Sequence, residues 1–296
     1  MRTTRLDASA ALELLKPLTW FAPMWAFGCG VVSSGHLRDG GWLLAAAGLV
    51  LSGPLVCGSS QAVNDWFDRH VDAINEPQRP IPSGRLPGRW GLYIAIGWTA
   101  LSVLVASTLG RWGFAAGIAG LAFAWAYSAP PFRLKRNGWY GNTAVAACYE
   151  GLPWVTGAAV MAAAAPAWQV LLLAALYSAG AHGIMTLNDF KSVDGDRQSA
   201  IRTLPVQLGV ARASRVACGV MIVPQLVVVA LLAAWGCLLS AGVIALLLIA
   251  QLALMQRFLR DPRERAPWYN ATGTSLYVIG MLVAAVALQS FGGAVA

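Results

Sequence analysis

Two short stretches gather oxygen-bearing side chains in a chain that has few charged residues. The first, NDWFDRHVD, spans residues 64–72 and supplies Asn64, Asp65, Asp68 and Asp72. The three acids stand at i, i+3 and i+7, which is the spacing that places side chains on one face of a helix. Like charges aligned in this way repel one another, so the cluster predicts a cation bound among them.

The second stretch, NDFKSVDGD, spans residues 188–196, repeats the first at an offset of 124 residues and supplies Asn188, Asp189, Asp194 and Asp196. Each copy follows an apolar segment, so the repeat predicts an internal duplication in which two helix ends face one another. Two facing carboxylate sets would form a cage of hard oxygen ligands, which suits Mg2+. Aspartates also mark ordinary helix ends, but the matched second copy favours the metal site.

The two copies differ at one position, because Ser192 stands where the first copy has Asp68. In the second copy, Asp194 adds a carboxylate close by. In the second copy, either Asp194 is a third carboxylate ligand of the cation or Asp189 and Asp196 are the only two, and the sequence leaves both interpretations open.

Basic side chains between and around the copies could hold a diphosphate. The segment YSAPPFRLKRNGWYGN, residues 127–142, has two prolines that end a helix and present a basic cluster. Arginine offers a planar fork that matches phosphate oxygens, and lysine offers a point charge. Loops of this kind also carry positive charge for topological reasons, but the carboxylate clusters favour a diphosphate site. The candidate diphosphate ligands are Arg79, Arg133, Lys135, Lys191, Arg202, Tyr127 and Asn188.

The elements that carry these residues are predicted to be membrane helices. Of the 296 residues, 57% are hydrophobic and 11% are charged, which is typical of a polytopic membrane protein. A spanning helix needs about 20 mostly apolar residues. The sequence therefore predicts an all-α fold of about nine transmembrane helices in a single domain of residues 1–296, near 16–36, 41–63, 91–109, 113–129, 142–163, 167–188, 214–235, 238–257 and 270–291.

The connections between these helices divide into a short set and a long set. The long ones, at 64–90, 130–141, 189–213 and 258–269, are predicted to lie on the same side as the amino terminus, and with it they carry all the Lys and Arg except Arg38 and Arg111. Cytoplasmic loops carry the excess of Lys and Arg. The amino terminus is therefore predicted to be cytoplasmic and the carboxyl terminus periplasmic. The net charge of +8 then reflects topology and contact with anionic lipid, and nucleic-acid binding is not needed to explain it.

Three longer motifs resemble those of the intramembrane UbiA-type prenyltransferase superfamily, and within it the chlorophyll and bacteriochlorophyll synthases. They are NDWFDRHVDAINEPQRPIPSGR, YSAPPFRLKRNGW and NDFKSVDGDRQSAIRTLPVQLG, and the resemblance covers nearly the whole chain. Many superfamily members have a third carboxylate at the position of Ser192, whereas the chlorophyll synthase branch has a serine followed by an acid at the position of Asp194. The stretch CYEGLPW, residues 148–154, is more similar to the bacteriochlorophyll enzymes.

This resemblance implies esterification of the 17-propionate of bacteriochlorophyllide a with geranylgeranyl or phytyl diphosphate, with release of diphosphate. It implies a helix bundle around a central cavity, with cytoplasmic loop helices, in the bacterial inner membrane, either cytoplasmic or intracytoplasmic and photosynthetic. The implied cofactor is Mg2+, with Asn64, Asp65, Asp68, Asp72, Asp189, Asp194 and Asp196 as candidate ligands. The candidate catalytic residues are Asp65, Asp68, Asp72, Asp189 and Asp196.

Four residues inside the predicted helices are candidates for the chlorin cavity. Glu150 is the only acid predicted within a span, and such residues usually face a cavity or a partner. His182 lies seven residues before Asp189, on roughly the same helical face and one layer deeper. Trp125 and Trp154 could flank a flat macrocycle. Hydrogen-bonded interior roles for the acid and the histidine, and interfacial anchoring by tryptophans, are the alternatives.

Other functions would account for parts of the same sequence pattern. The enzymatic alternatives are a chlorophyll synthase or another UbiA-type enzyme of quinone or haem pathways. A transporter would also show a duplication, but its charged sites lie at broken helices near the midplane. A pigment-binding assembly factor would have no use for the carboxylates. Partners are the two substrates and membrane lipid, with other pathway or photosystem assembly proteins possible; the oligomeric state is open.

Overall fold

The structure is a computed structural model that describes residues 7–36 and 40–292. The predictions for Arg38 and for the two chain ends lie outside the described residues. Within the described residues the secondary structure is helical, apart from an isolated parallel β-bridge between Asn137 and Arg202. The prediction of an all-α fold is confirmed.

The chain divides into two compact units. One comprises residues 1–24 and 42–134, and the other comprises residues 25–41 and 135–296. The stretch 64–72 belongs to the first unit and the stretch 188–196 to the second, so each unit holds one copy of the repeated motif. That residues 1–296 act as a single domain stays a prediction.

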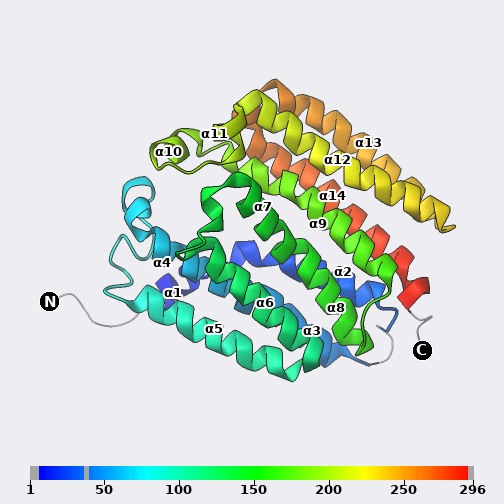
Figure 1. Ribbon diagram of the computed structural model, residues 1–296, viewed down its shortest axis with the longest axis horizontal. Coiled ribbons are helices and arrows are strands. Elements are labelled where there is room, and N and C mark those ends of the chain that lie inside the picture. The colour runs from blue at the N-terminus through cyan, green and yellow to red at the C-terminus, as the bar shows by residue number, and fades with distance from the viewer. Residues whose placement is uncertain (1–6, 37–39, 293–296) are drawn as a thin grey trace. The chain divides into compact units, whose positions relative to one another are not determined.

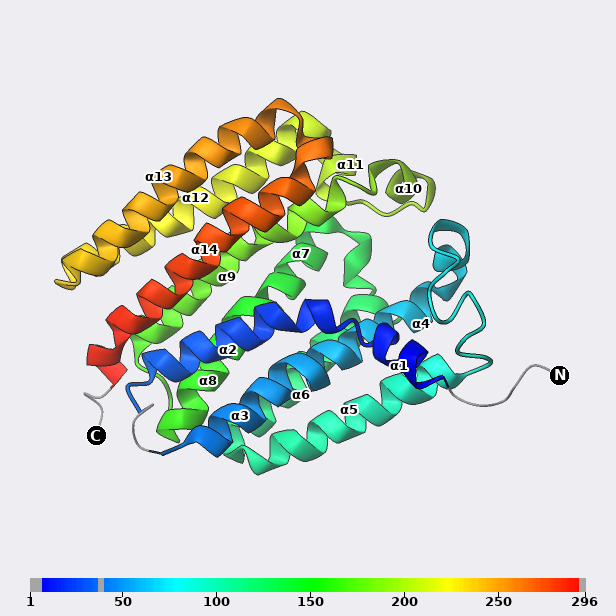
Figure 2. The same cartoon turned by 180° about the vertical axis from the view of Figure 1, so that it is seen from behind.

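The first unit is built around a long helix that carries the first motif (Figures 1 and 2). Helices α3, η2 and α4 form one continuous segment, in which η2 is a π-helical stretch at Pro54, a residue that has no N–H to donate. Helices α5 and α6 pack against α4. The elements are α1 (Ala8–Leu14), η1 (Pro17–Trp20), α3 (Trp42–Val50), η2 (Leu51–Cys57), α4 (Gly58–Asn75), α5 (Trp90–Thr108) and α6 (Gly110–Ser128).

The second unit is built around the largely buried helix α9. Helices α7, α12 and α14 pack against α9. Helices α12, α13 and α14 pack together, as both views show (Figures 1 and 2). The elements are most of α2 (Phe21–Ser33), then η3 (Leu134–Arg136), α7 (Gly138–Ala146), η4 (Ala147–Gly151), α8 (Leu152–Ala162), α9 (Trp168–Asp189), α10 (Val193–Gln198), α11 (Leu204–Leu208), α12 (Val210–Ala234), α13 (Leu238–Arg260) and α14 (Pro262–Gly292).

Six helical segments of the described chain are long and apolar enough to cross a membrane, judged by length and composition. They are 42–75, 90–108, 168–189, 210–234, 238–260 and 262–291. The predicted spans near 16–36, 113–129 and 142–163 correspond to other helices: η1 with α2, the glycine-containing α6, and α7 with η4 and α8. The protein is therefore a multi-pass membrane protein, and the count of nine spans stays a prediction.

Two predicted connections are wrong in their extent. The connection is expected to begin at residue 64, where the acids of the motif stand at helical spacing, but the spanning helix itself continues to Asn75, because the motif contains neither Gly nor Pro and the first proline that follows is Pro77. The connection at 258–269 was expected to be long, but Asp261 alone separates α13 from α14. By contrast, the connection at 189–213 contains the short helices α10 and α11.

Candidate active site

The first motif lies on the last turns of α4, whose helical geometry brings its acids to one side. Asp65 and Asp72 are buried, whereas Asp68 and Asn64 are half-buried. The Asn64 amide donates to Ser128 Oγ at 3.2 Å, a contact from α4 to the end of α6. The expected alignment at i, i+3 and i+7 is thus realised on a single helix.

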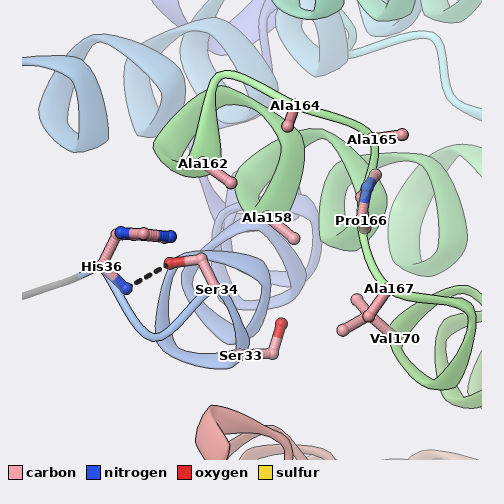
Figure 3. Close-up of a pocket in the computed structure, with 10 residues that line it drawn as sticks. All are labelled: Ser33, Ser34, His36, Ala158, Ala162, Ala164, Ala165, Pro166, Ala167 and Val170. Carbon is pink, nitrogen blue, oxygen red and sulfur yellow. Dashed lines mark hydrogen bonds between the residues drawn. The ribbon is translucent and has the colours of Figure 1, made fainter. Parts of the chain in front are cut away.

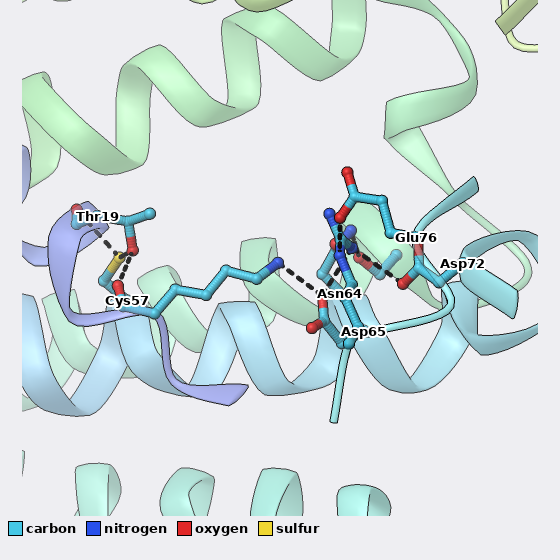
Figure 4. A network of polar contacts seen from close by, with 9 residues as sticks. Thr19, Cys57, Asn64, Asp65, Asp72 and Glu76 are labelled. Carbon is cyan, nitrogen blue, oxygen red and sulfur yellow. Dashed lines mark hydrogen bonds and ion pairs between the residues drawn. The ribbon is translucent and has the colours of Figure 1, made fainter. Parts of the chain in front are cut away.

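Asp65 and Asp72 of this motif form ion pairs with cations of the same unit (Figure 4). Lys16 Nζ lies 2.7 Å from Asp65 Oδ1. Arg79 Nη1 lies 3.4 Å from Asp65 Oδ1 and 2.9 Å from Asp72 Oδ2, and Arg79 Nε pairs with Glu76. Burial acts against the charge of Arg79, but the carboxylates of Asp65, Asp72 and Glu76 outweigh it and raise the pKa of Arg79 above its ordinary value.

Sequence reasoning missed Lys16. This residue has φ 47°, in the left-handed region, and it separates α1 from η1. In the sequence it is only one of the basic residues predicted to lie on the side of the amino terminus, because nothing in the local pattern connects it to a motif 49 positions away. A lone lysine beside a predicted helix start gives no signal of its partner, so only the fold could reveal this pair.

The loop after α6 belongs to both units, because the first ends at Leu134. Arg133 is half-buried with φ 42°, and its Nε is buried without a hydrogen-bond partner among the described residues. Lys135 follows in η3 of the second unit and is half-buried. Tyr127, near the end of α6, is half-buried as well. The buried, unsatisfied Arg133 Nε is a donor suited to an anionic ligand.

The second motif does not repeat the helical geometry of the first. Helix α9 ends at Asp189, and the remaining residues lie in a turn and in α10. The Asn142 amide of α7 donates to Asp189 Oδ2 at 3.1 Å and also contacts Thr186 Oγ1 at 3.2 Å. Asn142 therefore fixes one carboxylate oxygen of Asp189 from a neighbouring helix.

Asp196 is held by two hydroxyl groups. Ser192 Oγ donates to Asp196 Oδ2 at 2.7 Å, and Thr203 Oγ1 lies 3.3 Å from the same oxygen. Burial raises the pKa of Asp196, and the two hydrogen bonds act in the opposite direction. A half-buried carboxylate with directed donors differs from an aspartate that merely ends a helix in solvent.

The other predicted residues of this motif are exposed. Asp194 forms a fork with Arg263, with Nη1 at 3.2 Å from Oδ2 and Nη2 at 3.4 Å from Oδ1. The Asn270 amide donates to Asn188 Oδ1 at 3.3 Å. Lys191 is exposed, and so is Arg202, whose backbone forms the bridge to Asn137. The structure thus separates Asp194 from the contacts that hold Asp189 and Asp196.

The four interior candidates occupy different surroundings. Glu150 is buried in η4, and its Oε2 has no hydrogen-bond partner among the described residues. His182 is buried on α9 and stacks on Trp139, with ring centroids 5.5 Å apart. Trp154 is fully buried, and its Nε1 donates to Ser33 Oγ at 3.1 Å. Trp125, in the first unit, donates to Thr99 Oγ1 at 3.2 Å.

A separate cavity of about 210 Å³ lies in the second unit, near the end of α8 (Figure 3). Ser33, Ser34 and His36 line one side, with the His36 backbone N–H donating to Ser34 Oγ at 3.1 Å. Alanines of α8 and of the following loop line the other side. None of the predicted site residues lines this cavity.

The donor set of the first motif fits Mg2+ chemically. Its ligands are carboxylate and amide oxygens, which Mg2+ prefers. One atom, Arg79 Nη1, contacts Asp65 and Asp72 together, so a single positive centre already serves both carboxylates. Among the described residues no three His, Cys, Asp or Glu side chains are grouped as a metal centre. Substrate phosphate oxygens usually complete such a coordination shell.

The model of the UbiA prenyltransferase family matches residues 19–279, which contain both motifs. The chain belongs to this family. The chain is thus a prenyltransferase, as the motifs predicted.

Relatives place the chain among the chlorophyll and bacteriochlorophyll synthases of this family. It is 58% identical to the bacteriochlorophyll synthase 33 kDa chain of Cereibacter sphaeroides, over 96% of this chain and 94% of that one. It is 52% identical to the protein of the same name from Rhodobacter capsulatus, over 96% and 95%. The chloroplastic chlorophyll synthase of Avena sativa is 38% identical, over 93% of this chain and 75% of that one. The predicted resemblance is confirmed.

A solved structure shares the fold. A UbiA homolog from Archaeoglobus fulgidus, bound to DMAPP and Mg2+, aligns with a TM-score of 0.68 over 95% of this chain and 99% of that one. The sequences are 19% identical. This likeness confirms the fold class.

Proposed function

We propose that the chain is a bacteriochlorophyll synthase, which joins a geranylgeranyl or phytyl group from its diphosphate to the 17-propionate of bacteriochlorophyllide a. The observation that carries the proposal is the 58% identity to the bacteriochlorophyll synthase of Cereibacter sphaeroides along almost the full length of both chains. The resemblance of residues 148–154 to the bacteriochlorophyll enzymes supports the same branch. The runner-up is a chlorophyll synthase, for which the identity to the oat enzyme is 38%.

The reaction makes limited demands on acid–base chemistry. A propionate oxygen forms a bond to the allylic carbon, the bond from that carbon to the diphosphate oxygen breaks, and the diphosphate leaves with the electron pair. A carboxylic acid with an ordinary pKa of about 4 is already ionised near neutral pH, so the protein needs no strong general base. Its tasks are to align the two substrates, to balance the charge of the leaving group and to exclude water.

We assign the cation-binding role to the two motifs. In the first motif the proposed Mg2+ ligands are Asn64, Asp65, Asp68 and Asp72, and in the second motif they are Asp189 and Asp196. When bound, Mg2+ would supply Lewis-acid stabilisation of the departing diphosphate. Dependence on Mg2+ is supported by the donor types and by the Mg2+ and DMAPP bound to the homolog from Archaeoglobus fulgidus. The exposed pair with Arg263 favours a structural role for Asp194.

Lys16 and Arg79 would then neutralise the negative charge of the first motif when no metal is bound. With the carboxylates unneutralised by metal, the two cations balance Asp65 and Asp72. With Mg2+ held by the carboxylates, the ammonium of Lys16 and the guanidinium of Arg79 would be available to balance the charge of the diphosphate. Arg133, Lys135, Lys191, Arg202, Tyr127 and Asn188 are the further proposed contacts of the diphosphate, with the unpartnered Nε of Arg133 as the strongest of them.

For the chlorin, the proposal centres on Glu150 and His182, which are polar side chains buried in a helical interior. Glu150 Oε2 and both ring nitrogens of His182 have no hydrogen-bond partner among the described residues. Buried polar groups are normally satisfied, so such exceptions favour contact with a ligand. The indole N–H groups of Trp125 and Trp154 already donate hydrogen bonds within the protein. These two side chains are therefore better suited to apolar contact with the chlorin ring than to hydrogen bonding with it.

The membrane and the orientation are also part of the proposal. We infer a photosynthetic bacterial inner membrane, with the amino terminus and both motifs on the cytoplasmic side. The support is the distribution of Lys and Arg, of which only Arg38 and Arg111 fall in the opposite connections. Reporter fusions after residue 296 and within the loop around Gly84 would test the orientation. Activity of a periplasmic reporter at Gly84 would contradict it.

The function is tested with membranes containing the protein, labelled geranylgeranyl diphosphate and one of three acceptors: bacteriochlorophyllide a, chlorophyllide a or 4-hydroxybenzoate. We expect label in the bacteriochlorophyllide ester, loss of that product with excess EDTA, and recovery with Mg2+. Preferential labelling of chlorophyllide would favour the runner-up. Labelling of the benzoate alone would rule out both.

A further inference from the structure

Ser192 marks the position at which the two motifs differ, and its hydroxyl has a definite partner. The residue lies between α9 and α10, at the N-cap of α10. Its Oγ is 2.7 Å from Asp196 Oδ2 and 3.3 Å from the backbone oxygen of Asp189. A serine has one O–H to donate, and the short contact to a charged carboxylate is the stronger use of it. The serine therefore holds Asp196.

A second hydroxyl reaches the same oxygen from another part of the chain. Thr203 Oγ1 lies 3.3 Å from Asp196 Oδ2, and Thr203 is 7% exposed. Its backbone follows the bridge at Arg202, where the amide donates to the Arg136 oxygen at 2.9 Å and the carbonyl accepts from Gly138 at 2.8 Å. The bridge therefore fixes the position of the threonine.

The hydroxyl groups of Ser192 and Thr203 both bind the same carboxylate oxygen of Asp196. From the described part of the chain, Asp196 Oδ1 receives no hydrogen bond, whereas Oδ2 receives both. A carboxylate fixed through one oxygen presents the other in a set direction. Carboxylates that ligate metals are commonly oriented by hydrogen bonds of this kind.

We propose that Ser192 and Thr203 are positioning residues, which hold Asp196 by Oδ2 so that Oδ1 can bind the divalent cation that accompanies the prenyl diphosphate. This inference rests on the proposed function. It explains how the second motif operates without a third carboxylate. On the continuous helix α4, Asp68 occupies the corresponding position as an acid; in the second motif the helix ends at Asp189, and the corresponding residue orients an acid instead.

The test measures cation binding directly, with the full-length protein in detergent. Mn2+ is titrated and followed by electron paramagnetic resonance in the presence of methylene diphosphonate, an unreactive diphosphate. We expect Ser192→Ala to weaken Mn2+ binding about tenfold, in the range seen when hydrogen bonds to metal ligands are removed. Ser192→Thr, which keeps the hydroxyl, should restore binding. The matched control is Ser199→Ala, because Ser199 is an exposed serine at the other end of α10.

The activity of the same variants gives a second readout. Ser192→Ala should raise the Mg2+ concentration for half-maximal esterification about tenfold, with kcat close to the wild-type value at saturating Mg2+. Thr203→Val, which keeps the shape but removes the donor, should shift the Mg2+ dependence in the same direction by less, because its contact is longer. A purely structural role would lower kcat and the melting temperature without this shift.

Unchanged Mn2+ binding and Mg2+ dependence in Ser192→Ala would overturn the inference, as would an equal shift in Ser199→Ala. Wild-type protein that binds no Mn2+ with the diphosphonate would overturn it too. By contrast, wild-type protein that binds Mn2+ in a Ser192-dependent manner but forms no bacteriochlorophyll ester would contradict the proposed acceptor and support the role of Ser192.

Discussion

The ammonium of Lys16 lies 2.7 Å from Oδ1 of Asp65, although the two residues are 49 positions apart. Asp65 is 2% exposed, and Lys16 approaches it from the turn between α1 and η1. The pair ties the amino-terminal segment to the first motif within one unit. It also compensates a carboxylate that burial would otherwise penalise.

Replacing Lys16 with Met is expected to destabilise the protein by about 1–3 kcal/mol, because a buried carboxylate loses its nearest cation. The loss stays below the full cost of breaking a buried pair, since Lys16 is a quarter exposed and Arg79 remains 3.4 Å from Asp65. Thermal unfolding in detergent measures the change. The control is Arg85→Gln, which breaks the pair with Glu13 at the same 2.7 Å but in solvent, and it should cost under about 1 kcal/mol. Equal effects of the two substitutions would contradict the burial argument.

Asp65→Asn and Asp189→Asn are expected to lower turnover at least about a hundredfold while the protein still inserts, because each removes the negative charge of a proposed Mg2+ ligand. Asp194→Asn should retain activity within about threefold, since an exposed ion pair contributes little. Esterification rates of the three variants, measured across a range of Mg2+ concentrations, distinguish a metal ligand from a residue of an exposed ion pair. Near-normal activity of Asp65→Asn at saturating Mg2+ would argue against its metal role, and a severe loss in Asp194→Asn would restore that residue as a ligand.

Arg133→Ala is expected to raise KM for the prenyl diphosphate about tenfold or more, because the variant cannot form the proposed charged hydrogen bond to phosphate. Binding of the pigment should change little. Steady-state kinetics with each substrate varied in turn separate the two effects, with Arg136→Ala, an exposed residue of the same loop, as the control. If KM and kcat for the prenyl diphosphate stay at wild-type values, Arg133 does not contact it.

Gly157→Ala is expected to destabilise the second unit by about 1–3 kcal/mol through overpacking. A Cβ at Gly157 would meet the backbone oxygen of Phe27, where α2 and α8 approach one another closely. Gly242→Ala on α13 is the control, since a Cβ there meets nothing within 4 Å, and it should be neutral or stabilise the helix by up to about 1 kcal/mol. The melting temperatures of the two variants compare them directly. A similar melting temperature for both would mean that the helices can separate without cost.

The sequence by itself determined the class of fold, the two motifs and the family. These follow from local patterns: runs of apolar residues as long as a bilayer is thick, acids at helical spacing, and a second copy at a constant offset. The motif residues Asp65 and Asp72 could be paired in advance because helical periodicity alone aligns them.

Only the tertiary structure decided which side chains share a partner. Lys16 with Asp65, Asn142 with Asp189 and Thr203 with Asp196 join residues from different elements, and no sequence spacing encodes such pairs. The structure also decided where α4 ends and how short the turn at Asp261 is, because helix ends depend on packing and capping as well as on composition. The different roles of Asp68 and Ser192 also depend on tertiary structure. The first motif lies on the continuous helix α4, whereas the second motif leaves the helix after Asp189, so Ser192 contacts Asp196.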